Sequence, residues 1–333
     1  MLRGMSRRRV LGLLVALVAG CSSGSSGPSL SPVASSAGPA SAPTSMPTVA
    51  AASASRDLVI GGERPVTVFV PASYAADKPA PLLILLHGYG STGREHDDYF
   101  RLRSAAEARG FVYAHPDGTP DSQGDRFWNA TDACCDFGRT GVADADYLAG
   151  LVTSIKSSVN IDPKRIYFIG HSNGAFMSYR MACDHAELVA GIVSLAGATF
   201  AESTDCRPRR PVAVLEIHGT LDDAIAYDGG TISGVGAPGE PLDPYPGVLE
   251  TVDSWADYDG CSAPASDRPE RVDVDAEING PDGPAESTIK AATGCQAGGH
   301  VELWTIPNGG HSPDLASRFA DEVLDFLVAH PKP

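Results

Sequence analysis

Ser172 lies at the centre of a Gly-x-Ser-x-Gly pattern that begins at Gly170 and ends at Gly174. A short apolar run at 165–169 precedes the pattern, and residues with helical spacing follow it. This strand–turn–helix context exposes a serine hydroxyl at a sharp turn, where the N-terminus of the helix can stabilise an oxyanion. The same pattern around Ser22 lacks the context. The sequence therefore predicts that Ser172 is a nucleophile.

A serine nucleophile needs a general base. In chains built around such a turn, the base is a histidine that follows both the serine and an acid in the sequence. Among the histidines after Ser172, only His311 lies in a glycine-rich loop between an expected strand, 301–306, and an expected helix, 313–330. Glycines let the backbone of this loop approach closely and place an imidazole over the edge of a sheet. We therefore predict that His311 is the base.

The orienting acid is expected at the carboxyl end of an intervening strand, where ligand-facing loops gather. The apolar run 212–217 is followed by Asp222 and Asp223. We predict that Asp222 holds the imidazole of His311 in the correct tautomer, with Asp223 as the alternative. His218, at the end of the same run, is interpreted as a structural residue that hydrogen-bonds a loop.

Two backbone N–H groups are expected to bind the oxyanion. One belongs to Asn173, the residue after the nucleophile, and the other to a loop that follows an earlier strand. The residues at 85–90 provide such a loop, with the N–H of Tyr89 as the predicted donor. A glycine turn without a function is the alternative interpretation.

Short apolar runs alternate with segments of helical spacing. This is typical of an α/β fold with a mostly parallel sheet and helices on both faces. The polar segment 264–294 is expected to be an irregular surface excursion. The expected strands are 58–60 and 66–70, which form a hairpin, then 82–86, 111–114, 165–169, 191–195, 212–217 and 301–306. The expected helices are 100–109, 144–159, 173–185, 249–258 and 313–330.

The N-terminus resembles an export signal, because four arginines precede an apolar run at 10–19 that is too short to span a bilayer. Val-Ala-Gly-Cys at 18–21 resembles a lipobox and predicts that Cys21 is lipidated, with an ordinary cleaved signal as the alternative. The basic residues fit either the general or the twin-arginine export route. We interpret 1–21 as a signal, 22–55 as a disordered tether rich in Ser, Ala and Pro, and 56–333 as one folded domain.

The formal charge of the chain is −16, and removal of the four arginines in the signal would lower it to −20. Such an acidic surface argues against nucleic acid and against anionic polymers as partners. Contact with a membrane is expected only through the lipid on Cys21. The oligomeric state stays open.

Apart from Cys21, six cysteines remain, and an even number predicts three disulfides in an exported protein. Cys134 and Cys135 are expected not to pair with each other, because bridging neighbours strains the backbone. Cys261 with Cys295 is the one pair that we predict. The sequence has no Cys-x-x-Cys pair and no Cys/His cluster with ligand spacing, so no metal site is predicted.

Six motifs surround the candidate residues: LLHGYG at 85–90, FWNATDACC at 127–135, VADADYL at 142–148, DPKRIYFIGHSNGAFMSYRMAC at 162–183, EIHGTLDDAIAYDGG at 216–230 and IPNGGH at 306–311. In these motifs, and over 59–329 as a whole, the chain resembles the secreted polyhydroxybutyrate depolymerase and feruloyl esterase family, particularly LpqC-like actinobacterial lipoprotein esterases. The resemblance implies an α/β-hydrolase fold, no cofactor, and ester substrates that range from aliphatic polyesters to phenolic esters on plant polysaccharide. It also implies that Ser172, Asp222 and His311 are nucleophile, acid and base.

Two positions depart from the family pattern. Relatives usually continue the base motif with an aromatic residue, whereas Ser-Pro-Asp at 312–314 follows His311 here. In addition, Ala175 stands at the position of the elbow where relatives usually have a second glycine. Both changes bear on substrate preference. Trp128 is retained, and we predict that it stacks on an aromatic acyl group, with a packing role as the alternative.

The sequence thus predicts an exported serine carboxylesterase, lipid-anchored or extracellular, that forms an acyl-enzyme on a small or polymeric ester. A peptidase of the same fold is one alternative, since the triad does not choose between ester and amide bonds. A catalytically silent surface lipoprotein that binds wall polymer is another. Retention of every catalytic element disfavours the silent protein.

Overall fold

The computed structural model describes residues 54–232, 243–280 and 283–333. The folded unit to which they belong runs from Ala51 to Pro333. The predicted signal at 1–21, the lipidation site at Cys21 and nearly all of the tether at 22–55 lie outside the described residues. In the part that is described, no helix is long and apolar enough to cross a membrane.

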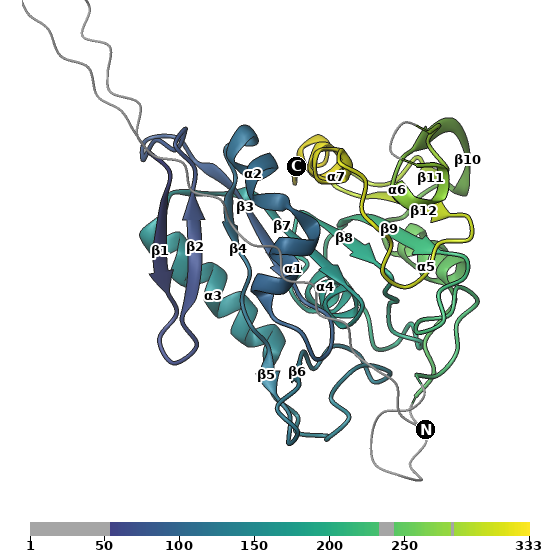
Figure 1. Cartoon of the computed structure of the whole chain (residues 1–333), viewed down its shortest axis with the longest axis horizontal. Coiled ribbons are helices and arrows are strands. Elements are labelled where there is room, and N and C mark those ends of the chain that lie inside the picture. The colour runs from purple at the N-terminus through teal and green to yellow at the C-terminus, as the bar shows by residue number, and fades with distance from the viewer. Residues whose placement is uncertain (1–53, 233–242, 281–282) are drawn as a thin grey trace, which may run out of the picture. The chain divides into compact units, whose positions relative to one another are not determined.

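In the described residues, twelve strands form one large sheet and one small one. They are β1 Arg56–Ile60, β2 Val66–Val70, β3 Ala80–Leu86, β4 Val112–Ala114, β5 Thr119–Pro120, β6 Arg126–Phe127, β7 Ile161–His171, β8 Gly191–Leu195, β9 Ala213–Gly219, β10 Ala263–Val272, β11 Ser287–Thr293 and β12 His300–Ile306. The 10-stranded sheet has the order β1-β2-β4-β3-β7-β8-β9-β12-β11-β10 (Figure 1), and β5 pairs with β6. The strands from β4 to β12 in this order are parallel, and an antiparallel pair extends each edge.

The helices are α1 Gly93–Phe100, α2 Leu102–Arg109, α3 Asp144–Ser158, α4 Asn173–Asp184, α5 Val248–Tyr258, α6 Ala276–Asn279 and α7 Phe319–Ala329. Side chains alternate between the two faces along a strand. In β3, Leu82 and Ile84 join the apolar cluster that includes α3, α4 and α5, whereas Leu83 and Leu85 join the cluster that includes α1, α2 and α7. The predicted mostly parallel sheet with helices on both faces is therefore confirmed.

The prediction for 264–294 is wrong. This segment contains β10 and β11, which pair antiparallel and continue the sheet beyond β12. The side chains of β10 are mostly exposed, because β10 is the edge strand. Its polar residues therefore lack the apolar alternation by which a strand is predicted. Helix boundaries also differ from the prediction, since α1 was not expected and α7 begins at Phe319.

Three disulfides join the six cysteines of the described residues. Cys261 pairs with Cys295, as predicted, and Cys183 pairs with Cys206. The prediction that Cys134 and Cys135 do not pair is wrong. The peptide bond between the two residues is cis, and their Cα atoms lie 3.0 Å apart. No group of three His, Cys, Asp or Glu side chains in the described ranges is arranged to hold a metal ion.

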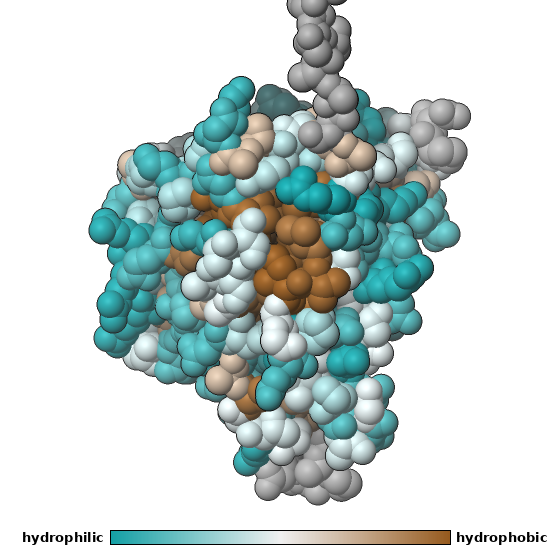
Figure 2. Space-filling model, turned by 90° about the vertical axis from the view of Figure 1, so that its left-hand side faces the viewer, coloured by the Kyte–Doolittle hydropathy of each residue, from teal (hydrophilic) through white to brown (hydrophobic). Residues whose placement is uncertain are grey.

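Apolar atoms gather on the face that lies at the β1–β2 edge of the sheet (Figure 2). Val59 of β1 is 75% exposed, the largest value for a large hydrophobic side chain in the described residues. In the strand order, β2, β4 and β3 separate β1 from β7, which carries the candidate nucleophile at its end. This apolar face is therefore distinct from the candidate site.

Candidate active site

Ser172 occupies the turn between β7 and α4. Its backbone has φ 55° and ψ −121°, which is unfavourable for a residue with a side chain. Two glycines permit the turn, because a Cβ at Gly170 would collide with the Gly174 carbonyl group and a Cβ at Gly174 with the Leu86 carbonyl group. The Ser172 N–H donates to the Leu195 carbonyl oxygen of β8 at 2.9 Å. The half-buried serine thus lies at the carboxyl end of a central strand.

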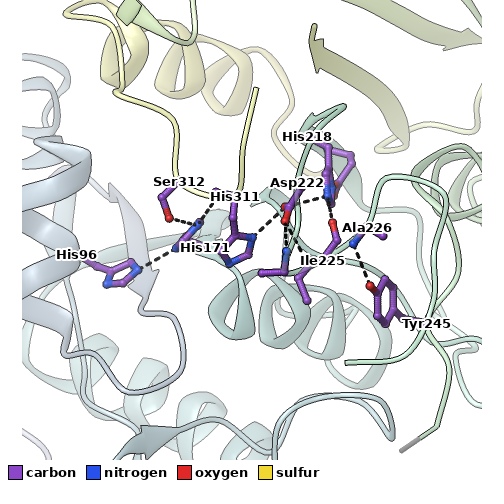
Figure 3. A network of polar contacts seen from close by, with 11 residues as sticks. His96, His171, His218, Asp222, Ile225, Ala226, Tyr245, His311 and Ser312 are labelled. Carbon is purple, nitrogen blue, oxygen red and sulfur yellow. Dashed lines mark hydrogen bonds and ion pairs between the residues drawn. The ribbon is translucent and has the colours of Figure 1, made fainter. Parts of the chain in front are cut away.

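Asp222 and His311 meet at the same edge of the sheet (Figure 3), after the neighbouring strands β9 and β12. Asp222 Oδ2 accepts a hydrogen bond from His311 Nδ1 at 2.8 Å. Asp222 Oδ1 accepts from the N–H groups of Ala224 and Ile225 at 2.9 and 2.8 Å. Burial alone would raise the pKa of Asp222, but hydrogen bonds from His218 and His311 outweigh it and hold this pKa well below its usual range. The carboxylate is therefore ionised and fixed in place.

His311 lies against His171, the residue before Ser172, with ring centroids 4.8 Å apart. His171 Nε2 donates to the His311 carbonyl oxygen at 2.8 Å and holds the loop. Burial lowers the pKa of His171 to about 3, so this ring is neutral. Within the described residues, no hydrogen bond joins the Ser172 hydroxyl to His311. Catalytic contacts of this kind are commonly long in a protein without substrate and tighten when substrate binds.

The loop after β3 packs directly on the serine. A Cβ at Gly88 would lie 3.4 Å from Ser172 Cβ. The Gly88 N–H donates to His96 Nε2 at 3.1 Å, and the Tyr89 hydroxyl turns away to donate to Asp121 Oδ2 at 2.6 Å. No backbone acceptor takes the Tyr89 N–H in the part of the chain that the structure describes. This N–H therefore lacks a backbone partner in that part of the chain, and it follows directly on Gly88, which packs against the serine.

Asn173 begins α4, so its backbone N–H has no partner inside the helix. Its side chain is fully buried, where Oδ1 accepts from the Trp128 N–H at 2.7 Å and Nδ2 donates to the Trp128 carbonyl oxygen at 2.9 Å. Nδ2 also lies 3.6 Å from Cys134 Sγ. These contacts fix the first turn of α4 next to the nucleophile.

The prediction that Trp128 stacks on substrate is wrong. Its side chain is 0% exposed, and its Nε1 donates to the His87 carbonyl oxygen at 3.1 Å. A ring without exposed surface offers no face to an acyl group. The alternative, a packing role, fits the structure: Trp128 contacts the loop after β3 through His87, and it contacts Asn173.

A cavity of about 410 Å³ lies close to Trp128 and Asn173, and none of Ser172, Asp222 and His311 lines it. Two of the residues that line the cavity contact the predicted oxyanion-hole residues. The Phe137 ring lies edge-on to Tyr89, with centroids 5.2 Å apart, and Cys134 contacts Asn173. The lining is mostly polar: Asn129, Thr131, Asp132, Cys134, Asp136, Phe137, Arg139, Gly141 and Asp243.

A buried polar chain that the sequence did not predict lies behind Asp222. Tyr179 donates to Glu216, Glu216 contacts His218, and His218 contacts Asp222. His218 does contact a loop, as interpreted, through the Ile225 carbonyl oxygen at 2.8 Å. A glutamate and a histidine at alternate positions of an otherwise apolar strand are the pattern that indicates such a chain. Asp223, the alternative acid, is exposed.

Comparison with known proteins gives a family model that matches part of the chain and several relatives. Residues 72–233 match a family model described as Phospholipase/Carboxylesterase. NocK of Nocardia uniformis subsp. tsuyamanensis, a protein named as an esterase, is 28% identical over 298 residues, which are 84% of this chain and 83% of NocK. Feruloyl esterase B of Piromyces equi is 28% identical over 268 residues, 80% of this chain but only 46% of that protein.

Among solved structures, acetyl xylan esterase from Aspergillus awamori matches with a TM-score of 0.53 at 16% identity, over 82% of this chain and 98% of that one. At this identity the likeness supports the fold alone. The fold predicted from the family resemblance is thereby confirmed. The chain thus has an α/β-hydrolase fold, and its match over 72–233 and its esterase relatives make it similar to carboxylesterases.

Proposed function

We propose that this α/β-hydrolase is an exported serine carboxylesterase with Ser172, Asp222 and His311 as its catalytic triad. The observation that carries the proposal is the hydrogen bond of 2.8 Å between the ionised Asp222 and His311 Nδ1. Because Nδ1 donates to Asp222, the other ring nitrogen of His311 carries the lone pair that a general base needs. The ring of His311 packs against the residue that precedes Ser172.

The proposed reaction proceeds through an acyl-enzyme. The Ser172 hydroxyl attacks the ester carbonyl carbon while His311 Nε2 takes its proton, and the N–H groups of Tyr89 and Asn173 stabilise the oxyanion. The intermediate collapses as His311 returns the proton to the leaving alcohol. Water, activated by the same imidazole, then attacks the acyl-enzyme and releases the acid. Asp222 stays ionised throughout and stabilises the imidazolium.

The substrate class that we propose is an ester on a polysaccharide, of the feruloyl or acetyl type, with polyhydroxyalkanoate as the alternative. Two relatives support it by name: the feruloyl esterase of Piromyces equi and a bifunctional acetylxylan esterase/xylanase of Neocallimastix patriciarum, which is 23% identical over 80% of this chain. The chain spans 46% and 33% of these two proteins. The polar lining of the cavity beside Tyr89 and Asn173 also suits a hydroxyl-rich alcohol.

We also propose export with a lipid anchor on Cys21, followed by the tether at 22–55 and the catalytic domain at 56–333. Three disulfides are typical of a protein that folds in an oxidising compartment and support export. Mass spectrometry of the membrane fraction should find a diacylglyceryl group on Cys21. A soluble mature protein with a different N-terminus would contradict the anchor.

Initial rates on an ester panel test the proposed substrate. The panel contains p-nitrophenyl acetate, methyl ferulate, acetylated xylan and amorphous polyhydroxybutyrate. We expect turnover of methyl ferulate or acetylated xylan above that of polyhydroxybutyrate. Turnover of polyhydroxybutyrate alone would favour the alternative substrate. Folded protein that hydrolyses no ester would contradict the proposed function.

A further inference from the structure

Asp222 has a second imidazole partner that the triad chemistry does not use. His218 Nε2 lies 3.2 Å from Asp222 Oδ2, the same oxygen that accepts from His311 (Figure 3). The same nitrogen lies 2.8 Å from the Ile225 carbonyl oxygen. A carbonyl oxygen and an ionised carboxylate can only accept, so His218 Nε2 carries a hydrogen and donates to both.

The other nitrogen of His218 faces a buried carboxylate. Nδ1 lies 2.9 Å from Glu216 Oε1, and the Tyr179 hydroxyl donates to Glu216 Oε2 at 2.8 Å. The side chains of His218 and Glu216 are both 0% exposed. Burial alone would lower the pKa of His218, but hydrogen bonds with Asp222 and Glu216 outweigh it and raise this pKa to about 9. Burial also raises the pKa of Glu216, against hydrogen bonds from His218 and Tyr179 that lower it. Because Glu216 accepts from the Tyr179 hydroxyl and faces His218 Nδ1 at 2.9 Å, we infer that the pair is an imidazolium and a carboxylate at neutral pH.

Few other charges face this cluster. Tyr227 contacts the His218 ring edge-on, with centroids 5.9 Å apart, and Tyr245 lies near Asp222. Burial raises the pKa of Tyr179, Tyr227 and Tyr245, so the three hydroxyls are neutral. The neutral ring of His171 lies beyond His311. The charges along the chain thus alternate from Glu216 through His218 to Asp222.

We propose that His218 is a positioning residue that acts through Asp222. As an imidazolium fixed by Glu216, it holds Oδ2 of Asp222 toward His311 and offsets part of the negative potential that Asp222 exerts on the catalytic imidazole. The acid limb of the pH–rate profile is therefore expected to lie at lower pH with a charged His218 than without it. The inference rests on the proposed function, because it needs Asp222 and His311 to be the acid and base.

The test measures kcat and KM of the full chain on p-nitrophenyl acetate between about pH 4 and 9. His218→Gln keeps an N–H donor but removes the positive charge. We expect kcat to fall by about 10-fold or more, KM to change little, and the acid limb of the pH profile to move upward by about half a unit or more. Glu216→Gln removes the negative charge that keeps His218 protonated. His218 should then be neutral, and the acid limb should move upward as in His218→Gln.

Two controls distinguish a positioning role of His218 from a purely structural one. His300→Gln alters another histidine two residues from a glutamate, His300 and Glu302 of β12, and should leave the acid limb unchanged. In the Asp222→Asn background, His218→Gln should cause no further loss, because a residue that acts through Asp222 has nothing left to position. Losses that multiply in the double variant would overturn the inference.

The remaining outcomes are also distinct. A folded His218→Gln with the wild-type kcat and acid limb overturns the inference while the proposed function stands, whereas wild-type protein that hydrolyses no ester defeats the proposed function itself. If neither variant folds, nitrogen-15 NMR of histidine in the wild-type chain tests the protonation state of His218 directly. At pH 7 we expect both ring nitrogens of His218 to be protonated, and a singly protonated ring would overturn the inference.

Discussion

The Asp222 carboxylate accepts a hydrogen bond from His311 Nδ1 at 2.8 Å, although 89 residues separate the two in sequence. Their strands, β9 and β12, are parallel neighbours, so both loops leave the sheet at the same edge. Backbone hydrogen bonds join the loops: Thr220 N–H donates to the Ile306 carbonyl oxygen at 3.0 Å and Leu221 N–H to that of Gly309 at 2.9 Å. The sheet therefore aligns Asp222 with His311.

Removal of the Asp222 charge should abolish most activity. Asp222→Asn leaves an amide that no longer fixes His311 in the tautomer with a free Nε2, so we expect kcat to fall by about 10³–10⁴-fold. Asp223→Asn is the matched control, because Asp223 is exposed, and it should keep the wild-type rate. Steady-state kinetics on p-nitrophenyl acetate measure kcat of both variants and of the wild-type protein. Equal losses in the two variants would contradict the assignment of the acid.

Gly174 should tolerate no side chain. A Cβ there would collide with the Leu86 and His87 carbonyl groups, so Gly174→Ala should strongly lower the melting temperature and the yield of folded protein. Gly150→Ala is the control. A Cβ at this exposed position in α3 meets no atom within 4 Å, and the change should stabilise the helix by about 0.5–1 kcal/mol. Similar melting curves for the two variants would contradict the geometry of the elbow.

The sequence predicts the central sheet and the elbow well, because both depend on local patterns. The strand before Ser172 contains the apolar run 166–169, and glycines flank the serine where backbone groups approach closely. Chain order and glycine content point to Asp222 and His311, which the sheet brings together. Their catalytic roles, and the N–H groups of Tyr89 and Asn173 as oxyanion donors, stay predictions that the experiments here test.

Other features depend on contacts that local patterns do not contain. The aromatic side chain of Trp128 suits stacking on a substrate, but Trp128 is buried because it packs against His87 and Asn173. Strand β10 is polar because it forms the sheet edge, so apolar periodicity does not reveal it. The role of His218 requires Glu216 and Asp222 to lie on opposite sides of one ring, which only the structure establishes.

Asp259 should make stability depend on pH. Its Oδ1 accepts from the Val212 N–H at 3.0 Å, and Oδ2 is buried. Burial raises the pKa of Asp259 to about 7, although backbone hydrogen bonds from Val212 and His300 oppose the rise. An acid whose pKa is raised on folding destabilises the native state as pH rises from about 4 to 7. Asp259→Asn should remove this decline and raise the unfolding free energy at pH 8 by about 1.4 kcal/mol per unit of pKa shift.

The control for this prediction is Asp257→Asn, at an exposed position two residues away. Its unfolding free energy should follow the wild-type dependence on pH. Urea denaturation at pH 5 and pH 8 measures all three proteins. A wild-type protein that is equally stable at both values, or an Asp259→Asn variant that declines in parallel with it, would refute the account of Asp259.

The disulfide between Cys261 and Cys295 should contribute to stability by closing a loop with a sequence separation of 34. Loop-closure entropy predicts that replacing both cysteines with serine lowers the unfolding free energy by about 3–4 kcal/mol. The pair lies after α5 and β11, away from Ser172, so kcat should be unchanged. A large loss of kcat in the folded variant would show that this disulfide also supports the site.

Covalent labelling tests the central claim, that Ser172 is the nucleophile of a serine hydrolase, most directly. The full chain and its Ser172→Ala variant are incubated with a fluorophosphonate probe, and intact-mass and peptide mass spectrometry then locate the adduct. We predict one adduct per wild-type chain, located on Ser172, and none on the variant. Folded wild-type protein that stays unlabelled, or equal labelling of Ser172→Ala, would contradict the claim.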